Sequence, residues 1–390
     1  MENSIHWSSI TMIIYILMGT IPTLLIKYAA KIQYRKTIIK MDNKKYLFAS
    51  NKTKYYFWGW LYITFFATFR KADGIFGGAD SLSYIMDFMN SDKLVISFKK
   101  AITIQNYREP GYMFIVKFIH CFTDNPKVYF FIIYGFIAFT FLYFISVFAS
   151  EIKNYAVLPL FIYPFILGFN TMRESLAVSF VLLSIIELNK KKKITTLIYL
   201  FIATMIHFTA GIFFSIPFMY WIANTRLIKN KSISKKRAIV VLFGYLAGAI
   251  LSIEFLKSIV MTTHFYHYIN EKQNISGLIR YSVLTILIIV FYKELVKRYN
   301  SHTILVWLSF FDLILWPITS SLNFWRADEY FAIARAIVWC DVSDILINKY
   351  ISVRKHRICK IIIYFLAIIW FSYRIYRTYE GSSLMPYIFS

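Results

Sequence analysis

A chain of 390 residues that is 58% hydrophobic and only 16% charged carries more apolar side chains than one or two soluble cores can bury. Its formal net charge of +24 comes from short Lys and Arg runs between apolar segments, a pattern that excludes a separable nucleic-acid-binding patch and follows the positive-inside rule. The sequence therefore predicts an all-α, polytopic integral membrane protein with about 11–13 transmembrane or re-entrant helices.

The first two predicted spans frame a basic loop. A span needs about 20 mainly apolar residues to cross the hydrocarbon core, and Ile10–Ala29 and Tyr55–Phe69 fit that requirement approximately. The run between them, from Lys31 to Lys54, is rich in lysine and is expected in the cytoplasm. This orientation places the N-terminus outside.

Residues 70–127 form the longest hydrophilic stretch and contain charges of both signs. We expect an outer-face loop region here. Within it, Gly111–Phe122 is apolar but too short to span, which predicts a re-entrant or interfacial helix.

The middle of the chain alternates spans with basic turns. The predicted spans are Val128–Ala149, Tyr155–Phe169 and Leu176–Leu188, and the last reaches four lysines, Lys190–Lys193. The next segment, Ile194–Ala223, is long for one span and short for two, and basic residues flank both of its ends. We predict a hairpin that turns near His207. The rival structure is one tilted helix, which would reverse every later segment.

Five further spans complete the topology: Ile239–Val260, Leu278–Tyr292, Ile304–Ile318, Tyr330–Leu346 and Ile358–Phe371. The basic connections alternate consistently, so both termini are expected outside a bacterial cytoplasmic membrane. No internal repeat or linker divides the sequence, which predicts a single multi-pass domain over residues 1–390.

Polar clusters next to apolar sequence fall on the predicted outer face. Ionisable groups at the edge of the hydrocarbon are costly and usually face a cavity or a partner. Arginines, carboxylates, a histidine and tyrosines together favour a site for an anionic ligand. The residues that we select are Asp80, Tyr84, Arg108, Glu109, Asn170, Arg173, Glu174, His207, Arg326 and Arg335.

Several of these residues also have purely structural explanations. Glu174 and Glu109 each stand at the start of a predicted helix, where an acid interacts favourably with the helix dipole. Arg173 can extend its guanidinium to lipid headgroups, and a single interior His207 can simply be hydrogen-bonded in a core. The pair His264 and His267 has HxxH spacing, but no third metal ligand is apparent.

Soluble-enzyme signatures are missing from the sequence. It contains no GxxxxGK[ST], GxSxG or HExxH motif and no GxGxxG after a predicted strand, so nucleotide-driven chemistry is not expected. The three cysteines lack CxxC spacing, and neither a disulfide framework nor a zinc site is predicted. Asp312 lies in mid-span without an assigned role.

The order of the polar motifs resembles the EpsG family of Wzy-like polymerases of O-antigen, capsule and exopolysaccharide. The resemblance runs from about Gly77 to the end of the chain. It departs from that family's pattern at Glu174, where the family has Gln after the arginine. The motifs that carry it are Asp80…Tyr84, Glu109-Pro110-Gly111-Tyr112, Asn170-Thr171-Met172-Arg173, Ile206-His207-Phe208-Thr209, Arg326…Glu329-Tyr330-Phe331 and Tyr379…Met385-Pro386-Tyr387.

This resemblance implies a membrane glycosyltransferase with GT-C-like architecture and no cofactor. Such an enzyme transfers a growing glycan from undecaprenyl pyrophosphate to a sugar hydroxyl of another lipid-linked repeat unit at the outer face. Its partners are that lipid-linked oligosaccharide, the bilayer, and a flippase and chain-length regulator of the same pathway.

The residues fit the implied chemistry. Glu109, His207 or Asp80 is expected to act as the general base. The binding groups for the pyrophosphate and the sugars are then Arg173, Arg108, Tyr84, Asn170, Glu174, Arg326 and Arg335. Two alternatives stay open, namely another membrane glycan enzyme, such as a lipid-phosphate-sugar glycosyltransferase or a ligase, and a transporter or flippase of lipid-linked glycan.

Overall fold

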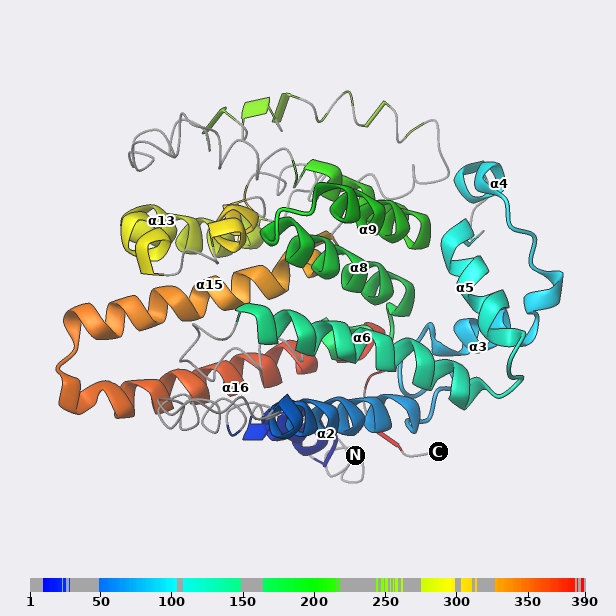
Figure 1. The fold of residues 1–390 in the computed structure, drawn as a ribbon, viewed down its shortest axis with the longest axis horizontal. Coiled ribbons are helices and arrows are strands. Elements are labelled where there is room, and N and C mark those ends of the chain that lie inside the picture. Colours follow the sequence, from blue (N-terminus) through cyan, green and yellow to red (C-terminus); the bar gives the residue numbers. More distant parts are fainter. Residues whose placement is uncertain are drawn as a thin grey trace, which may run out of the picture. The chain divides into compact units, whose positions relative to one another are not determined.

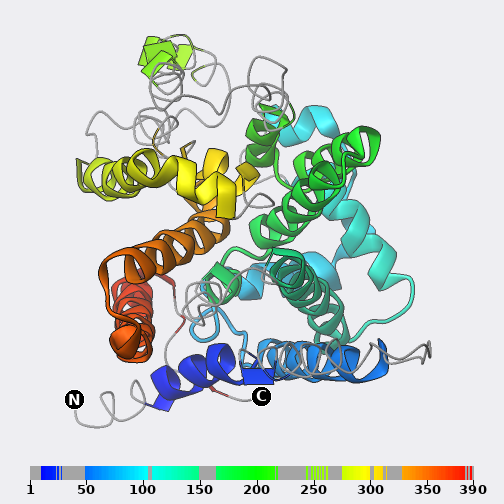
Figure 2. The same ribbon diagram turned by 60° about the vertical axis from the view of Figure 1, so that its left-hand side comes forward.

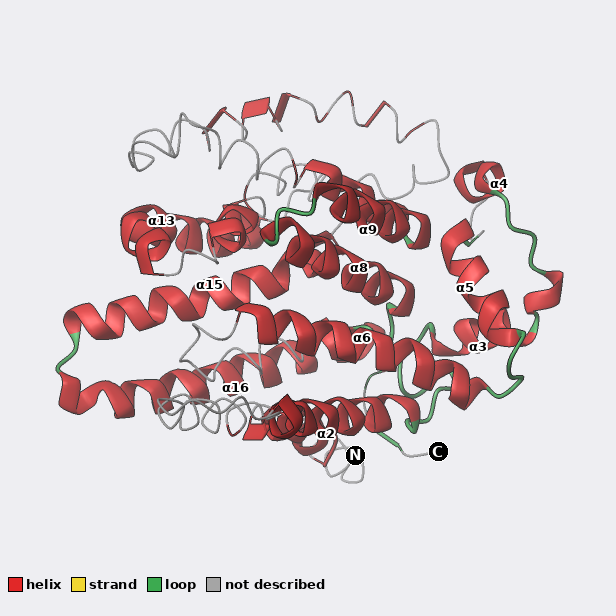
Figure 3. Ribbon diagram, viewed as in Figure 1, coloured by secondary structure: helices red, strands yellow, loops and turns green. Residues whose placement is uncertain are grey.

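The structure is a computed structural model, and its described part consists of helices joined by loops (Figure 3). No strand occurs among the residues it describes, so the prediction of an all-α chain is confirmed for them. The described residues are 10–22, 49–103, 108–148, 164–215, 275–298, 303–310 and 327–382, with isolated positions within 24–28, 217, 243–261, 313 and 384–388.

The helices follow the predicted spans closely where the chain is described (Figure 1). Their bounds are α2 Ala49–Thr68, α3 Ser81–Met89, α4 Phe98–Thr103, α5 Pro110–His120, α6 Pro126–Phe148, α8 Met172–Asn189, α9 Lys193–Ile206, α13 Ile275–Arg298, α15 Ala327–Tyr350 and α16 His356–Ser382, with 3-10 helices η1 Ser91–Lys93, η2 Phe208–Phe214 and η5 Val353–Lys355. Of the predicted spans Tyr155–Phe169, Ile239–Val260 and Ile304–Ile318, only parts are described.

Two described helical segments are long and apolar enough to cross a membrane, Pro126–Phe148 and Val353–Tyr373. Shorter apolar helices occupy Ile10–Pro22 and Lys193–Ile206. Large apolar side chains of α16 are exposed, including Ile362, Phe365 and Ile369 at 50–61%, and exposed apolar surface of this extent is typical of a face that meets lipid or another protein. The number of spans, their orientation and a GT-C-like arrangement remain predictions.

The chain divides into two compact units, which are described separately. Unit 1 contains Met1–Leu94, Ile115–Ser179 and Ile358–Ser390, and unit 2 contains Val95–Phe114 and Phe180–Arg357. Helices α5 and α8 each contribute residues to both. The prediction of one multi-pass domain stays a prediction.

Unit 1 is built around the contact of α2 with α6. Gly135 of α6 faces α2, where a Cβ would stand 3.4 Å from side-chain atoms of Trp60 and Thr64. The indole Nε1 of Trp60 donates a hydrogen bond to the Gly135 carbonyl at 2.7 Å. Helix α6 begins at Pro126, a favoured residue in the first turn, and the Asn125 side chain accepts the Lys127 N–H at 2.8 Å.

Residues near the end of the sequence join unit 1 to its first helices. The Tyr15 hydroxyl donates to the Leu384 carbonyl, the Tyr387 hydroxyl donates to the Phe66 carbonyl, and the Tyr387 N–H donates to Thr11 Oγ1, each at 2.6 Å. Tyr15 and Tyr387 also make an edge-to-face contact, with ring centroids 5.9 Å apart. These bonds fix the positions of Leu384 and Tyr387.

Unit 2 contains the turn from α8 to α9 at the predicted cytoplasmic lysines. Lys191 adopts the left-handed conformation at φ 63°, the Lys192 N–H donates to the Glu187 carbonyl, and the Lys191 N–H donates to the Leu188 carbonyl. This is the hydrogen-bond pattern of a Schellman cap. It ends α8 and reverses the chain within a few residues.

Helix α9 ends at Ile206, where the predicted hairpin turns. His207 is extended at φ −152° and ψ 116°, and η2 then packs against α9. A Cβ on Gly211 would stand 3.4 Å from the Thr204 methyl group. The rest of the return limb and the Arg226 flank lie outside the described residues, so the hairpin itself stays a prediction.

In the same unit α13 packs against α15, yellow and orange in Figures 1 and 2. Helix α13 has a kink at Phe291, whose φ of −103° and ψ of 16° are not helical.

Candidate functional site

Two groups of the selected residues come together, one in each unit. Glu109 and His207 meet in unit 2, and Asp80, Tyr84 and Asn170 meet in unit 1. Arg326, together with Asp312, His264 and His267, lies outside the described residues.

The pair in unit 2 is a short hydrogen bond between residues 98 positions apart. Nδ1 of His207 lies 2.7 Å from Oε1 of Glu109. The side chains are 16% and 9% exposed, so both are largely shielded from solvent. The geometry thus links two residues that the sequence offered as alternative bases.

Backbone structure holds each partner at the end of a helix. Glu109 precedes Pro110, and its carbonyl accepts the Met113 N–H at 3.1 Å, so it caps the N-terminus of α5. His207 caps the C-terminus of α9, where its N–H donates to the Ala203 carbonyl at 2.9 Å. Because backbone bonds anchor both residues, the side-chain pair is held in position.

Gly111 explains how these two helix ends approach one another. A Cβ at this position would stand 2.7 Å from the backbone carbonyl carbon and oxygen of Met205. Such contacts essentially never occur between real atoms, so only glycine fits without a shift of backbone. The Glu-Pro-Gly sequence therefore supplies a carboxylate, a helix start and the space for α9 in three consecutive residues.

The pairing sets the tautomer of the imidazole. An ionised carboxylate only accepts hydrogen bonds, so Nδ1 of His207 carries the proton shared with Glu109. In the neutral ring Nε2 then has the lone pair. A histidine held in this way can take a proton at Nε2, and the adjacent carboxylate stabilises the cation that forms.

The residues after His207 contact the start of α15. The hydroxyls of Thr209 and Tyr330 lie 3.3 Å apart. Phe213 stacks on Phe331 with ring centroids 4.8 Å apart and also contacts the Tyr330 ring at 5.0 Å. Two of the motifs that carry the family resemblance therefore pack together around a buried aromatic cluster.

The group in unit 1 forms where the loop before α3 meets the start of α8. Asn170 Oδ1 accepts the Asp80 N–H at 3.0 Å, and the Asn170 carbonyl accepts the Tyr84 hydroxyl at 3.2 Å. Gly78, at φ +114°, makes this approach possible because a Cβ there would stand 2.3 Å from the Phe169 carbonyl oxygen. The hydrogen bond to Asp80 uses its backbone, which leaves its predicted role as a base untested.

Arg70 is a buried arginine that the sequence analysis placed only at the start of the hydrophilic stretch 70–127. It is 1% exposed. Its guanidinium donates to the Gly77 carbonyl at 2.8 Å, to the Ala67 carbonyl, and to the Tyr134 hydroxyl at 2.8 Å. It also lies over the rings of Tyr134 and Phe169, 4.5 Å and 4.3 Å from their centroids.

Arg70 thus ties the end of α2 to the loop that presents Asp80. The sequence signal was an arginine that follows an aromatic span and precedes a pair of glycines. That signal was too general to reveal the role.

The remaining selected residues take intermediate or buried positions. Glu174 is 2% exposed in the first turn of α8, whereas Arg173 beside it is half-buried. Arg108 and Arg335 are also half-buried. Their roles in ligand binding stay predictions from the sequence.

Comparison with known proteins gives one family. The sequence model described as the EpsG family matches residues 53–389, which is most of the chain. No curated protein and no solved structure gives a significant match.

Proposed function

The chain belongs to the EpsG family. From this premise we propose that it polymerises oligosaccharide repeat units linked to undecaprenyl pyrophosphate, and that it does so at the outer face of the bacterial cytoplasmic membrane. Family membership supports a polysaccharide polymerase of the Wzy-like kind. The lipid-pyrophosphate donor and the outer face are parts of the proposal.

The observation that supports a catalytic role is the shielded pair of Glu109 and His207. Transfer of a glycan to a hydroxyl needs a group that removes the hydroxyl proton as the new bond forms. His207 meets this need through Nε2. Glu109 positions the ring through Nδ1 and stabilises the imidazolium.

In the proposed step one bond forms at the anomeric carbon and one breaks. The acceptor oxygen bonds to the anomeric carbon while its proton passes to Nε2 of His207. The bond from the anomeric carbon to the phosphate oxygen breaks, and its electron pair leaves with the pyrophosphate. Arginines suit that leaving group because a guanidinium gives permanent charge and two parallel donors. Arg173 is the first candidate for this contact, and Arg173→Lys is then expected to restore only part of the activity that Arg173→Ala removes.

The test compares two matched histidine variants of the full chain. His207→Gln is expected to reduce polymer formation about 100-fold or more, the usual range for loss of a general base. His120→Gln is the control, because His120 has a similar exposure of 18% and also faces a carboxylate, that of Asp124 at 3.5 Å. Polymer is measured as a gel ladder made by purified protein from lipid-linked repeat units, which are extracted from a strain that lacks the chain.

Normal polymer from His207→Gln would end the catalytic assignment. Equal losses in both variants would indicate a general effect on folding and would equally count against it. Product from units whose lipid pyrophosphate has been removed would refute the proposed donor.

A further inference from the structure

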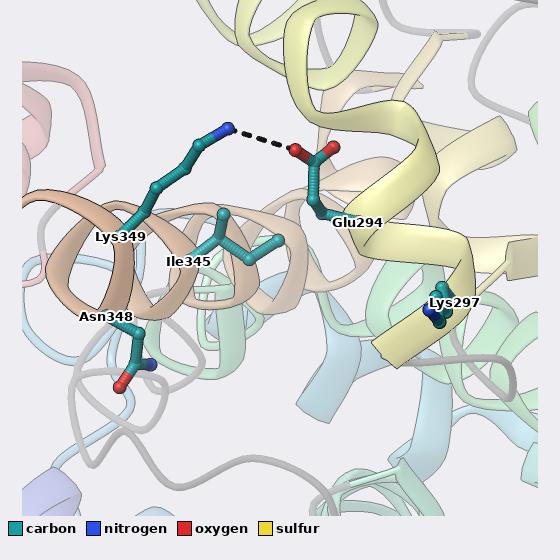
Figure 4. Close-up of a pocket in the computed structure, with 5 residues that line it drawn as sticks. All are labelled: Glu294, Lys297, Ile345, Asn348 and Lys349. Carbon is teal, nitrogen blue, oxygen red and sulfur yellow. Dashed lines mark hydrogen bonds and ion pairs between the residues drawn. The ribbon is translucent and has the colours of Figure 1, made fainter.

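A pocket of about 430 Å³ opens between the C-terminal ends of α13 and α15, both in unit 2. Figure 4 shows its lining residues, which are Glu294, Lys297, Ile345, Asn348 and Lys349. Both helices follow predicted spans that run toward the cytoplasm. The pocket is therefore expected at the inner surface of the membrane.

The side chains that line the pocket carry two positive charges and one negative charge. Lys349 Nζ lies 3.1 Å from Glu294 Oε1, the dashed contact in Figure 4, and both side chains are close to half exposed. Lys297 is exposed and has no ion-pair partner among the described residues of this unit. An anion that enters thus meets a single uncompensated ammonium group and a second one held by a solvent-accessible carboxylate.

An apolar stripe on α13 precedes the pocket residues Glu294 and Lys297 along the helix. Val283, Ile286 and Val290 are 47%, 58% and 48% exposed and recur at spacings of three and four. At these spacings side chains share one face of a helix. Lys297 follows Val290 after seven residues, beyond the kink at Phe291, and is also exposed. Along α13, an exposed apolar surface is thus followed by cationic groups.

We propose that this pocket binds the phosphodiester headgroup of an anionic phospholipid of the cytoplasmic leaflet, with an acyl chain along the Val283–Ile286–Val290 stripe. The lysines bind the phosphate, and the carboxylate of Glu294 accepts a hydroxyl of a glycerol headgroup. The stripe favours a lipid over a soluble phosphate, since a soluble anion would gain nothing from it. This binding goes beyond glycan polymerisation and does not depend on that function.

The probe is phosphatidylglycerol, titrated into the full chain purified in neutral detergent and followed by native mass spectrometry. Lys297→Gln combined with Lys349→Gln is expected to weaken binding roughly 30-fold, because each lysine near an anionic lipid contributes about a fivefold factor. Glu294→Gln is expected to strengthen binding, since it releases Lys349 from its competing carboxylate. Lys190→Gln is the matched control, an ion-paired lysine in the turn after α8, and is expected to leave binding unchanged.

Further ligands separate the sources of phosphate. Weaker binding of phosphatidylcholine, and no displacement by inorganic phosphate at equal concentration, support the proposal. Equal binding of phosphatidylcholine, displacement by inorganic phosphate, tighter binding of a polyprenyl phosphate, or weaker binding by Glu294→Gln would each overturn it.

Discussion

Glu109→Gln isolates the proposed work of the carboxylate in the Glu109–His207 pair. The amide has nearly the same shape as the carboxylate, so the packing of α5 against α9 is expected to survive. The substitution removes the negative charge beside the imidazole. It also no longer fixes the tautomer of His207, because an amide can present either an acceptor or a donor to Nδ1.

The structure sets the size of the expected effect. A hydrogen bond to a charged group is worth about 1.5–3 kcal/mol, and the side chains are exposed by only 9% and 16%, so solvent screening removes little of it. At about 1.36 kcal/mol for each tenfold change in rate, the loss is roughly 10- to 150-fold in kcat. This is less than the loss expected for His207→Gln, since Glu109 acts through the histidine.

The assay is the initial rate of polymer formation at saturating lipid-linked substrate, measured for both single variants and for the double variant. Residues that act as one unit give losses that do not add, so the double variant is expected to be no slower than His207→Gln. Glu187→Gln makes the same chemical change in a carboxylate paired with Lys190 at 2.7 Å and is expected to keep the normal rate.

Additive losses in the double variant would refute the positioning role of Glu109. A larger loss in Glu109→Gln than in His207→Gln would instead make the carboxylate the base. Unchanged activity in Glu109→Gln would remove the pair from the mechanism.

Three further predictions concern the surroundings of the site. Gly111→Ala forces a Cβ against the Met205 backbone at 2.7 Å. It is expected to cost about 1–3 kcal/mol of stability and to lower polymer yield. The control is Gly244→Ala, where a Cβ would have nothing within 4 Å, and this variant is expected to leave the melting temperature unchanged or raise it. Gly78→Ala places a side chain at φ +114° and is expected to destabilise unit 1 by about 1–3 kcal/mol from backbone strain alone, measured as a lower melting temperature. Backbone N–H groups that follow Asp73, and a nearby lysine, hold the pKa of its carboxyl below the usual range. Asp73 therefore stabilises the fold at pH values above the ordinary carboxyl pKa, and this contribution is lost as the pH falls through the lowered pKa. The melting temperatures of wild type and Asp73→Asn should therefore converge between about pH 7 and about pH 3, and a constant difference would contradict this assignment.

The sequence predicted helices well and long-range pairings poorly. Span positions follow from apolar runs and basic turns, and a helix start follows from a residue such as Pro110, because these signals are local. The contact of Glu109 with His207 spans 98 positions and depends on Gly111, whose role appears only when the opposing helix is in place. Both residues were selected, but as alternatives.

Arg70 illustrates the other limit. In the sequence, Arg70 only begins the hydrophilic stretch 70–127. In the structure it is enclosed by Tyr134 and Phe169 and donates to backbone carbonyls. Enclosure by aromatic rings from two segments far apart in the chain leaves no pattern in one sequence. Glu174 is similar, since a first-turn acid and a buried acid look the same before the fold is known.

The contacts of Leu384 and Tyr387 with the first two helices have a consequence for synthesis. Unit 1 combines early, middle and late segments of the chain, so a ribosome must deliver nearly the whole sequence before that unit can close. Until then Tyr15 and the Phe66 carbonyl lack these partners, and contacts of such long sequence separation form slowly. A chain that stops short of Leu384 therefore lacks the hydrogen bonds that join these late residues to the first helices.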